Sequence, residues 1–465
     1  MMEKIRILHT NDLHSHLENW PKMRRFLQEK QQAQAEEHVI TVDLGDFADR
    51  WHPLTEASDG RSNVALMNQV HYDAVTIGNN EGIGNAKQVL NHLYDDANFP
   101  VILANLYDKA TLQLPEWADL FKIITTDRGT KVGLIGVTAP FPLTYTPNGW
   151  DIRQWMDILP ELVQQLRPQV DVLVLLSHLG IADDYLIVEE LPAIDVILGS
   201  HTHHLFPAGE MVNGVQLVAA GKFGYYVGEV TVFLDDQHRL LKTTAQTFAT
   251  ADMAELPQDA DEIFQYMEAG HRLLQEKKVA WLPHALSLNN YEAESLVLET
   301  LAAARKRGRT EVALLNTGLF LAELPQGLVN QDELHTILPH PMRLIRVTLL
   351  GRDVIRLVLE IEKNRQFLSS FPIVGMGFRG KIFGKVIYDG LSYDATNHTV
   401  AWRGRAIEEE KAYTLTTVDH LMFVPFFPTI EIAGQHEFLF PEFIRTVLAE
   451  HLAQKYPLPR FEENK

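Results

Sequence analysis

The stretch "IRILHTNDLHSH", residues Ile5–His16, begins as an apolar run and ends in Asn, Asp and His. We predict a buried strand over Ile5–Leu8, because continuous Val, Ile and Leu runs are typical of strands covered on both faces. Asp12 and His14 follow at the carboxyl end of this strand. Residues two apart on an extended segment point to the same side, so these two side chains can serve one locality.

The order of apolar strand, polar loop and helical stretch repeats through the first half of the chain. Buried strands that alternate with helices are typical of an α/β sheet covered on its faces. Two later segments, "GEVTVFLDD" and "LLKTTAQTF", alternate between apolar and polar residues and predict a hairpin. The further strands are predicted at Val39–Leu44, Ala74–Ile77, Val101–Ala104, Lys131–Val137, Val172–Ser177, Val196–Leu198 and Gln216–Ala220.

Residues of the types that bind metals follow several of these strands, and the strand ends are where ligands bind in α/β sheets. After Asp12 and His14, the later strands deliver Asp46, Asn79, His178, and the pair His201 and His203 in "GSHTHH". Each one alone is more often a turn residue or a satisfied polar residue. Together they are seven oxygen or imidazole donors at successive strand ends, a pattern that chance rarely produces. Two donor pairs and one shared carboxylate describe a binuclear metal site.

The composition narrows the possible partners and ligands. The chain has 465 residues, which predicts about two or three domains. Its 41 Lys+Arg and 61 Asp+Glu give a net charge of -20, which argues against nucleic-acid polymers and anionic membranes as partners. Without Cys, any metal must use His, Asp, Asn or Glu. No apolar leader and no run of about 18 apolar residues occur, so a cytoplasmic protein is expected.

The pattern along the chain predicts three regions. Residues 1–252 are expected to form the domain that carries the metal donors. Residues 253–280 form a charged, amphipathic helical connector, and residues 281–465 form a second unit that mixes helices and strands. In this second unit we predict helices at Glu292–Lys306 and Arg352–Lys363 and strands at Val312–Leu315, Arg343–Leu349 and Tyr413–Thr417.

The motifs "NDLHSH", "GD", "GNNE", "SHLG" and "GSHTH" follow one another in this order over about two hundred residues. This series resembles the calcineurin-like metallophosphoesterase superfamily and, within it, the 5′-nucleotidase and bacterial UDP-sugar hydrolase family. The resemblance implies a four-layer α/β-β-α metal domain followed by a 5′-nucleotidase-like α/β domain that recognises the substrate. It also implies a metal-dependent phosphoesterase that hydrolyses a nucleotide or another small phosphate ester through a metal-bridging hydroxide.

The resemblance assigns the metal ligands residue by residue. The amide oxygen of Asn79 would be a neutral ligand, and Gly78 would let the backbone turn tightly around it. Two divalent ions about 4 Å apart would lower the pKa of a bridging water and clamp the oxygens of an in-line displacement. Hard O and N ligands suit Mn, Zn or Mg. One ion would be held by Asp12, His14 and His203, the other by Asn79, His178 and His201, with Asp46 as the bridge.

The chain departs from this family at the catalytic dyad. Asn80 stands where "G-N-H-E" has its His, and Ile83 stands where the family has the Asp that orients this His. General acid catalysis is typically worth 10²–10⁴-fold, so we expect a slow enzyme or, alternatively, a metal-dependent nucleotide-binding or sensing protein. Asn80 can still donate a hydrogen bond to a phosphoryl oxygen. An imidazole from His204, His16 or His52 could also replace the missing group.

The second unit departs further from the family. The segment "NTGLFLAE" lacks the Arg of the family's "N-G-G-x-R". "PHPMRL" keeps an arginine near the family's "P-F-G-N" turn, and the arginine of "IVGMGFRGK" could neutralise phosphate charge. "TTVDHLMFVPFFPT" offers rings that could stack on a base, although core packing is their commoner role. The candidate substrate-binding residues are Asn316, Arg343, Arg379, His420, Phe426 and Phe427.

Overall fold

The computed structural model describes residues 2–32, 37–292, 294–373, 375 and 377–459. The chain divides into two compact units, Met1–Gly270 and His271–Lys465. Helix α9, Asp259–Gln275, crosses this division and accounts for the helical pattern expected between 253 and 280. Two positions of the "IVGMGFRGK" loop, Val374 and Met376, lie outside the described residues.

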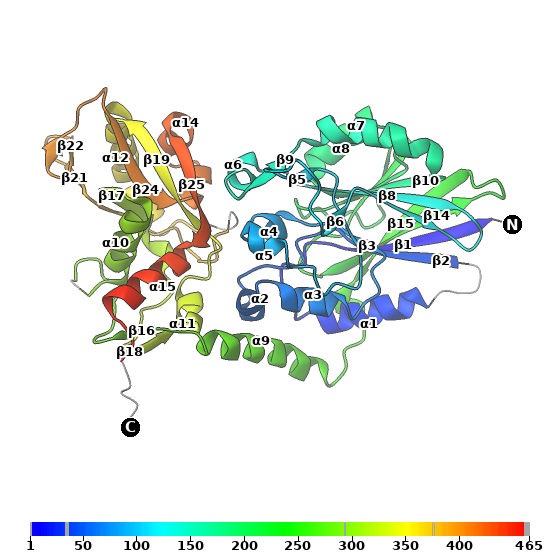
Figure 1. Ribbon diagram of the computed structural model, residues 1–465, viewed down its shortest axis with the longest axis horizontal. Coiled ribbons are helices and arrows are strands. Elements are labelled where there is room, and N and C mark those ends of the chain that lie inside the picture. The colour runs from blue at the N-terminus through cyan, green and yellow to red at the C-terminus, as the bar shows by residue number, and fades with distance from the viewer. Residues whose placement is uncertain (1, 33–36, 293, 374, 376, 460–465) are drawn as a thin grey trace. The chain divides into compact units, whose positions relative to one another are not determined.

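The first unit is built on two large sheets (Figure 1). In the first sheet, each strand of the run β1, β2, β3, β4 and β6 pairs parallel with the next, and the predicted hairpin closes the edge by pairing antiparallel with β1. In order, this sheet contains β15 (Leu240–Ala249), β14 (Tyr226–Leu234), β1 (Glu3–Thr10), β2 (Glu37–Asp43), β3 (Ala74–Val75), β4 (Val101–Ile102) and β6 (Ala118–Asp119).

The second sheet of this unit has a parallel centre and antiparallel edges. In order, it contains β12 (Glu210–Val212), β13 (Val215–Ala219), β11 (Val196–Gly199), β10 (Val172–His178), β8 (Lys131–Thr138) and β7 (Lys122–Thr125). All the strands expected from the sequence are therefore present. β3 and β4 are shorter than predicted. Beyond β4, the Ala104 N–H donates a hydrogen bond to the Gly136 carbonyl of the second sheet.

The side chains of these strands separate into an inner and an outer core. In β10, Val172, Val174 and Leu176 pack between the two sheets, whereas Leu173 and Leu175 belong to the outer core. This alternation follows from the period of two in a strand, and burial on both faces explains the continuous apolar runs in the sequence. The core between the sheets and the cores on their outer faces define a four-layer α/β-β-α unit, as expected.

Helices cover the two outer faces. In Figure 1, α7 and α8 lie on one side of the unit and α1 and α3 on the opposite side, with the sheets between them. Helices α1 and α3 contribute to the core on the first sheet, and α7 and α8 to the core on the second. The helices of this unit are α1 (Trp20–Gln31), α2 (Pro53–Ser58), α3 (Arg61–Met67), α4 (Asn79–Gly82), α5 (Lys87–Leu90), α6 (Pro142–Tyr145), α7 (Trp155–Leu166) and α8 (Ile181–Glu190). A short antiparallel pair joins β5 (Leu106–Asp108) to β9 (Trp150–Ile152).

The second unit is built on a five-stranded mixed sheet. In order, its strands are β20 (Val386–Asp389), β17 (Val312–Asn316), β24 (Ala412–Val418), β19 (Arg343–Leu350) and β25 (Gln435–Phe443). Two small sheets accompany it: β16 (Lys278–Leu282) with β18 (Gly327–Asn330), and β21 (Leu391–Asp394) with β22 (Thr399–Trp402) and β23 (Arg405–Ala406).

One apolar core joins the sheets and helices of the second unit. Its helices are α10 (Leu296–Gly308), α11 (Gln331–Ile337), α12 (Gly351–Leu368), α13 (His420–Phe423), α14 (Pro428–Ala433) and α15 (Ile444–Lys455). The predicted helices and strands correspond to α10, α12, β17, β19 and β24. Across the described part of the chain, no helix is both long enough and apolar enough to cross a membrane.

Candidate metal centre

The loops that follow β1 and β2 run beside each other beyond the ends of their strands. The Asp12 N–H donates to the Gly45 carbonyl (3.0 Å), and the His14 N–H donates to the Asp46 carbonyl (2.8 Å). These bonds continue the parallel pairing of β1 with β2 past the sheet edge. The donors expected at two different strand ends therefore lie side by side.

Six of the seven predicted ligand side chains converge in two groups of three. In each group, one ligand atom per residue lies within 4.8 Å of the ligand atoms of the other two. Four of the six residues are buried and two are partly exposed. The first group is Asp12, His14 and His203, and the second is Asp46, His178 and His201.

The spacing of the first group fits a common ion. His14 Nε2 lies 3.1 Å from His203 Nε2 and 3.7 Å from Asp12 Oδ1. His203 Nε2 lies 3.5 Å from the same carboxylate oxygen. Donors bound tetrahedrally to one ion at about 2.1 Å are about 3.4 Å from each other. This group therefore has the donor separations that a divalent metal requires.

His178 of the second group and the predicted ligand Asn79 each keep a buried acceptor atom without a hydrogen bond to any described residue. His178 donates its Nδ1–H to the Leu44 carbonyl (2.7 Å), which leaves Nε2 as the unprotonated nitrogen in the neutral ring. His178 Nε2 and Asn79 Oδ1 are both buried and have no hydrogen-bond partner among the described residues. An orphaned buried acceptor is costly, and a cation is a partner that would satisfy such an atom. The donor set therefore fits a cation on this side too.

Asp46 lies within reach of both groups. Its Oδ2 is 3.7 Å from His14 Nε2 in the first group and 3.4 Å from His178 Nε2 in the second. The Asp46 side chain is buried, so its carboxylate cannot be compensated by bulk water. A single carboxylate between two imidazole groups is the arrangement expected of a ligand that two ions share.

The sequence interpretation assumed extended backbone at these ligand positions, but the structure has left-handed backbone there. Left-handed backbone costs an L-residue roughly 1–2 kcal/mol, and it normally occurs at isolated positions. Here the left-handed backbone directs side chains from tight loops to one place. The two members of each pair therefore meet because of their loop, and not because residues two apart on a strand share a face. The ligand residues with positive φ are Asp12 (49°), His14 (49°), Asp46 (53°), His201 (69°) and His203 (60°).

A second buried carboxylate orients His14. Asp49 Oδ2 lies 3.4 Å from His14 Nδ1, on the ring nitrogen opposite the one that faces Asp12 and His203. The Asp49 side chain is only 3 % exposed, and its Oδ1 accepts the Trp51 N–H. A carboxylate behind a ligand imidazole fixes the tautomer and raises the basicity of the nitrogen that faces the metal.

The charges of the cluster show why it favours a cation. Burial opposes charge on Asp12, but hydrogen bonds from His14 and His203 outweigh burial and hold the pKa of Asp12 well below its usual range. Burial also disfavours protonated His14 and His178, yet the neighbouring carboxylates raise the pKa of His14 to about 10 and that of His178 to about 9. His14 and His178 thus carry protons where a metal ion would supply positive charge instead.

Asn80 is turned toward the candidate bridging carboxylate. Its backbone N–H donates to Asp46 Oδ1 (2.7 Å), and its side-chain Nδ2 donates to Asp46 Oδ2 (2.7 Å). The same Nδ2 lies 3.3 Å from His14 Nδ1. In this conformation Asn80 orients Asp46, and its amide cannot act as the general acid that the family's His supplies.

Gly78 is required by a close approach and not by a tight turn. Its φ of -94° and ψ of -175° are extended backbone, which any residue can adopt. A Cβ at Gly78 would lie 2.0 Å from Asp46 Oδ1, and a Cβ at Gly45 would lie 2.1 Å from the Gly78 nitrogen. The expected role of Gly78 is therefore corrected, because the glycine lets two loops touch where Asp46 stands.

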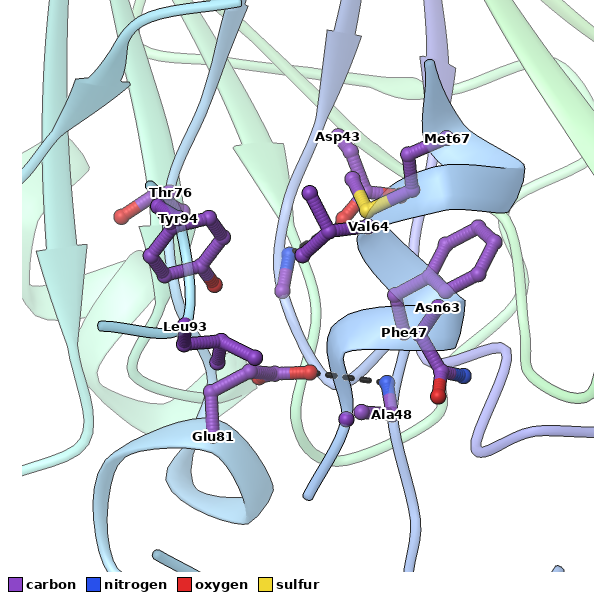
Figure 2. A pocket seen from close by; sticks show the side chains of 12 residues that line it. Asp43, Phe47, Ala48, Asn63, Val64, Met67, Thr76, Glu81, Leu93 and Tyr94 are labelled. Atoms are coloured by element: carbon purple, nitrogen blue, oxygen red, sulfur yellow. Dashed lines mark hydrogen bonds between the residues drawn. The ribbon is translucent and has the colours of Figure 1, made fainter. Parts of the chain in front are cut away.

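Glu81 joins these two loops, and the sequence interpretation did not assign it a role. Its carboxylate accepts the N–H groups of Asp46 (2.9 Å), Gly78 (2.9 Å) and Ala48 (2.8 Å). Figure 2 shows the bond to Ala48 and the small cavity that Glu81 helps to line. Its position three residues after Gly78, at the start of α4, is the sequence signal for such a backbone acceptor.

Two aromatic side chains flank the groups and were also missed. The Phe223 ring lies 5.8 Å from the His14 ring and 6.3 Å from the His203 ring, measured between centroids. The Phe141 ring lies 5.8 Å from the His201 ring and is 39 % exposed. Each group therefore has an aromatic neighbour from a different loop.

The three histidines considered as substitutes for the missing acid lie outside both groups. His204 is exposed, and its Nδ1 lies 2.9 Å from Thr202 Oγ1. His16 Nδ1 lies 2.7 Å from a Glu18 oxygen. His52 is buried and its Nδ1 caps α2 by accepting the Leu54 N–H. None of these contacts directs an imidazole proton at the ligand groups.

In the second unit, the aromatic candidates gather around the buried ring of Phe383. This ring lies 6.0 Å from His420, 6.3 Å from Phe426 and 5.9 Å from Phe427. His420 and Phe427 are themselves buried, whereas Phe426 is partly exposed. Stacking on a base therefore remains a prediction, and in this conformation it is open only to Phe426.

The polar candidates of the second unit are engaged within the protein. The Asn316 amide donates to the Phe383 carbonyl (2.8 Å). The buried Arg343 guanidinium lies 4.3 Å from the centre of the Phe443 ring. Arg379 donates its backbone N–H to His340 Nδ1 (2.9 Å). Their roles toward a substrate stay predictions.

Comparisons with known proteins agree with this architecture. The calcineurin-like phosphoesterase family model matches residues 5–205, and the model of the 5′-nucleotidase C-terminal domain matches residues 283–423. The chain is 36% identical to YunD, an uncharacterized metallophosphoesterase of Bacillus subtilis, over 98% of this chain and 100% of that protein. The chain therefore belongs to the calcineurin-like metallophosphoesterases that carry a 5′-nucleotidase C-terminal domain.

More distant relatives carry nucleotidase names. A snake venom 5′-nucleotidase of Crotalus adamanteus is 27% identical over 52% of this chain and 47% of that protein. The crystal structure of a 5′-nucleotidase precursor from Thermus thermophilus covers 99% of this chain and 98% of its own, with a TM-score of 0.58 and 19% identity. At that identity the match supports the fold alone.

The substitution Glu81→Gln tests the connection between the loops. We expect the free energy of unfolding to fall by about 1–3 kcal/mol, because the amide NH₂ would face a backbone N–H and leave a buried donor unsatisfied. Urea unfolding of the full chain measures the change. The exposed Glu116→Gln is the matched control and should change stability by less than about 0.5 kcal/mol. Equal midpoints for both variants would show that the three bonds do not stabilise the fold.

Proposed function

We propose that this chain is a metal-dependent phosphoesterase that hydrolyses a nucleotide or a related small phosphate ester. The observation that carries this proposal is the pair of donor groups with Asp46 within reach of both. Family membership supports hydrolase chemistry at phosphorus. The proposed ligands are Asp12, His14 and His203 for one divalent ion, Asn79, His178 and His201 for the other, and Asp46 for both.

Divalent ions bound there would supply an activated water and positive charge for the phosphoryl oxygens. The residues of the chain do the positioning that phosphoryl transfer mainly depends on. Asp49 holds the His14 ring, and Asn80 holds both oxygens of Asp46. Glu81 fixes the loop that carries Asp46 against the loop that carries Asn79 and Asn80. These contacts keep the donors in place before a substrate arrives.

Substrate recognition is proposed for the second unit, over residues 281–465, with 1–252 as the metal domain and 253–280 as the connector. The match to the 5′-nucleotidase C-terminal domain supports this division of roles. Phe426 is the proposed stacking residue, because its ring is partly exposed beside Phe371 (5.1 Å). Arg379, also partly exposed, is the proposed phosphate contact.

A binding or sensing role is the second candidate. It is favoured by the residues at the dyad positions, since Asn80 carries no acidic proton and Ile83 packs against the apolar core. A protein of this kind would hold a nucleotide at its metals without turning it over. The complete set of donors favours the enzyme, because binding alone does not need a binuclear site.

Turnover measurements separate the two candidates. Metal-stripped protein is supplied with Mn, Zn or Mg and then with a panel of nucleotides, dinucleotides and an aryl phosphodiester. We expect at least one phosphate ester to be hydrolysed when metal is supplied, and this activity to be lost when a chelator is added. Nucleotide binding in the presence of metal, without release of any product, would support the sensing role and contradict the enzyme.

The variant Asp46→Asn tests the shared ligand. We expect the metal content to fall at both positions, because an amide oxygen carries no negative charge to hold two cations. Elemental analysis after dialysis measures ions per chain, with Asp127→Asn as an exposed control on the same unit. Two ions retained per chain in the Asp46 variant would show that Asp46 is not the bridge.

The double variant Asn80→His with Ile83→Asp rebuilds the family's dyad. Per folded and metallated molecule, we expect hydrolysis of simple phosphate esters to rise about ten-fold or more, because part of the acid catalysis returns. Asn80→His alone should help little, because its imidazole lacks the carboxylate that sets the tautomer. A dyad variant that is folded and fully metallated but no faster would show that Asn80 serves a different mechanism.

A further inference from the structure

A cleft in the second unit lies at the end of its sheet opposite to the candidate substrate residues. Strands β17 and β24 run parallel, and Asn316 and His420 stand at or just beyond their carboxyl ends. The cleft is lined at the amino ends of the same strands, by residues 309–311 before β17 and 412–414 at the start of β24. Residues of the β22–β23 hairpin and of the following loop complete it. Of the residues that line the cleft, none is a candidate substrate-binding residue.

The cleft is large enough for a small organic molecule. Its volume is about 360 Å³. Ligand pockets typically have volumes of about 300–1,000 Å³, whereas a water molecule takes up roughly 30 Å³. The backbone on one side is fixed, because the Arg309 N–H caps α10 by donating to the Lys306 carbonyl (3.3 Å) and Thr310 Oγ1 donates to the Val312 carbonyl (2.9 Å). The cleft therefore has a defined wall at the end of this helix.

An aromatic ring forms another wall of the cleft. The Tyr413 ring is partly exposed, and its centre lies 4.9 Å from that of the buried Trp402 ring. The Tyr413 hydroxyl accepts the Glu408 N–H (3.0 Å), and Trp402 Nε1 donates to a Glu311 oxygen (3.1 Å). Both rings are thus held in place by hydrogen bonds. A planar group can stack on an aromatic side chain that is fixed in this way.

The charged residues of the cleft leave two guanidinium groups available. Lys411 Nζ lies 3.3 Å from a Glu408 oxygen, so these two charges compensate each other. Glu311 is turned toward the Trp402 indole. Arg309 and Arg405 are exposed. In the described part of the chain, no carboxylate lies within ion-pairing distance of either guanidinium.

This pair of arginines is unusual for the second unit. In a chain with a net charge of -20, most exposed cations find a carboxylate. Arg309 and Arg405 come from different segments, the end of α10 and strand β23, yet they line one cleft. Seven other arginines of this unit each have a carboxylate partner: Arg305, Arg307, Arg346, Arg352, Arg356, Arg365 and Arg403.

Guanidinium groups beside an aromatic wall suit an anion that carries a planar group. A guanidinium presents its N–H donors as a planar fork that matches the oxygens of a phosphate. Two such cations can balance the charge of about -1.5 to -2 on a phosphate monoester. Inorganic phosphate alone would leave the Tyr413 ring without a contact, whereas an ester with a planar organic group would use both the cations and the ring.

We propose that this cleft is a second ligand site, which binds a phosphate ester with a planar organic group, such as a nucleotide. Arg309 and Arg405 bind the phosphate, and the Tyr413 ring stacks on the planar group. The site needs neither the donor groups of the first unit nor hydrolysis. It therefore goes beyond the proposed phosphoesterase function and is tested separately from it.

Four probes separate the two parts of the ligand. Calorimetric titration of the full chain, stripped of metal and kept at low salt with a chelator, measures the affinity for AMP, adenosine, ribose 5-phosphate and inorganic phosphate. We expect AMP to bind about ten-fold or more tightly than adenosine and inorganic phosphate, as for charge-assisted hydrogen bonds. Equal affinities for AMP and adenosine would overturn the role of the cations. Equal affinities for AMP and ribose 5-phosphate would overturn the role of the ring.

The double variant Arg309→Gln with Arg405→Gln places the binding in the cleft. We expect its affinity for AMP to fall about ten-fold or more and its salt dependence to weaken, with the affinity for adenosine unchanged. Tyr413→Leu should lower the affinity for AMP but not for ribose 5-phosphate. Arg356→Gln is the matched control, because Arg356 is exposed on α12 of the same unit and pairs with Asp353 of its own helix (3.3 Å). Its affinity for AMP should change by less than about two-fold.

The variant Phe426→Ala distinguishes the cleft from the candidate substrate residues. We expect AMP to bind this variant, without metal, as tightly as the wild type. A loss of AMP binding in Phe426→Ala, together with wild-type affinity in the double arginine variant, would overturn the proposal and assign the binding to the other end of the sheet. A metal-free wild type that binds none of the four probes would also overturn it. Either result would leave the proposed metal-dependent hydrolysis untouched.

Discussion

The arrangement of the candidate metal centre depends on one buried carboxylate. Glu81 accepts backbone N–H groups from Asp46, Ala48 and Gly78, and so ties the loop after β2 to the loop after β3. Burial of a carboxylate is costly unless such donors satisfy it, which makes the three bonds mutually dependent. The loops can approach only because Gly45 and Gly78 have no Cβ at the contact. Asp46 then stands where both donor groups reach it.

The sequence predicts the order of the strands and the donors that follow them, because apolar runs and polar strand ends are local signals. It does not predict the left-handed backbone at Asp12 or His203, which is set by contacts between loops far apart in the chain. The loop of residues 221–224, which carries Phe223, is not predicted for the same reason. Its signal, two glycines around "KF", is weak until the bond from Phe223 to Asp12 is known.

Aromatic residues serve cores and binding sites equally well, so sequence patterns alone do not separate these two roles in the second unit. His420, Phe426 and Phe427 lie close in sequence, yet only Phe426 keeps part of its ring exposed. The ring that brings them together, Phe383, is more than thirty residues away and belongs to no recognised motif. Sequence patterns locate such a cluster but do not say which face of it meets solvent.

The left-handed backbone at five of the six grouped residues limits how far the donor cage can expand. These residues have few alternative backbone conformations, and the bonds between the loops hold them where they are. Selectivity among divalent ions depends on cavity size, ligand number and the flexibility of the ligands. Donors held in this way would respond more strongly to ionic radius than donors carried on flexible loops.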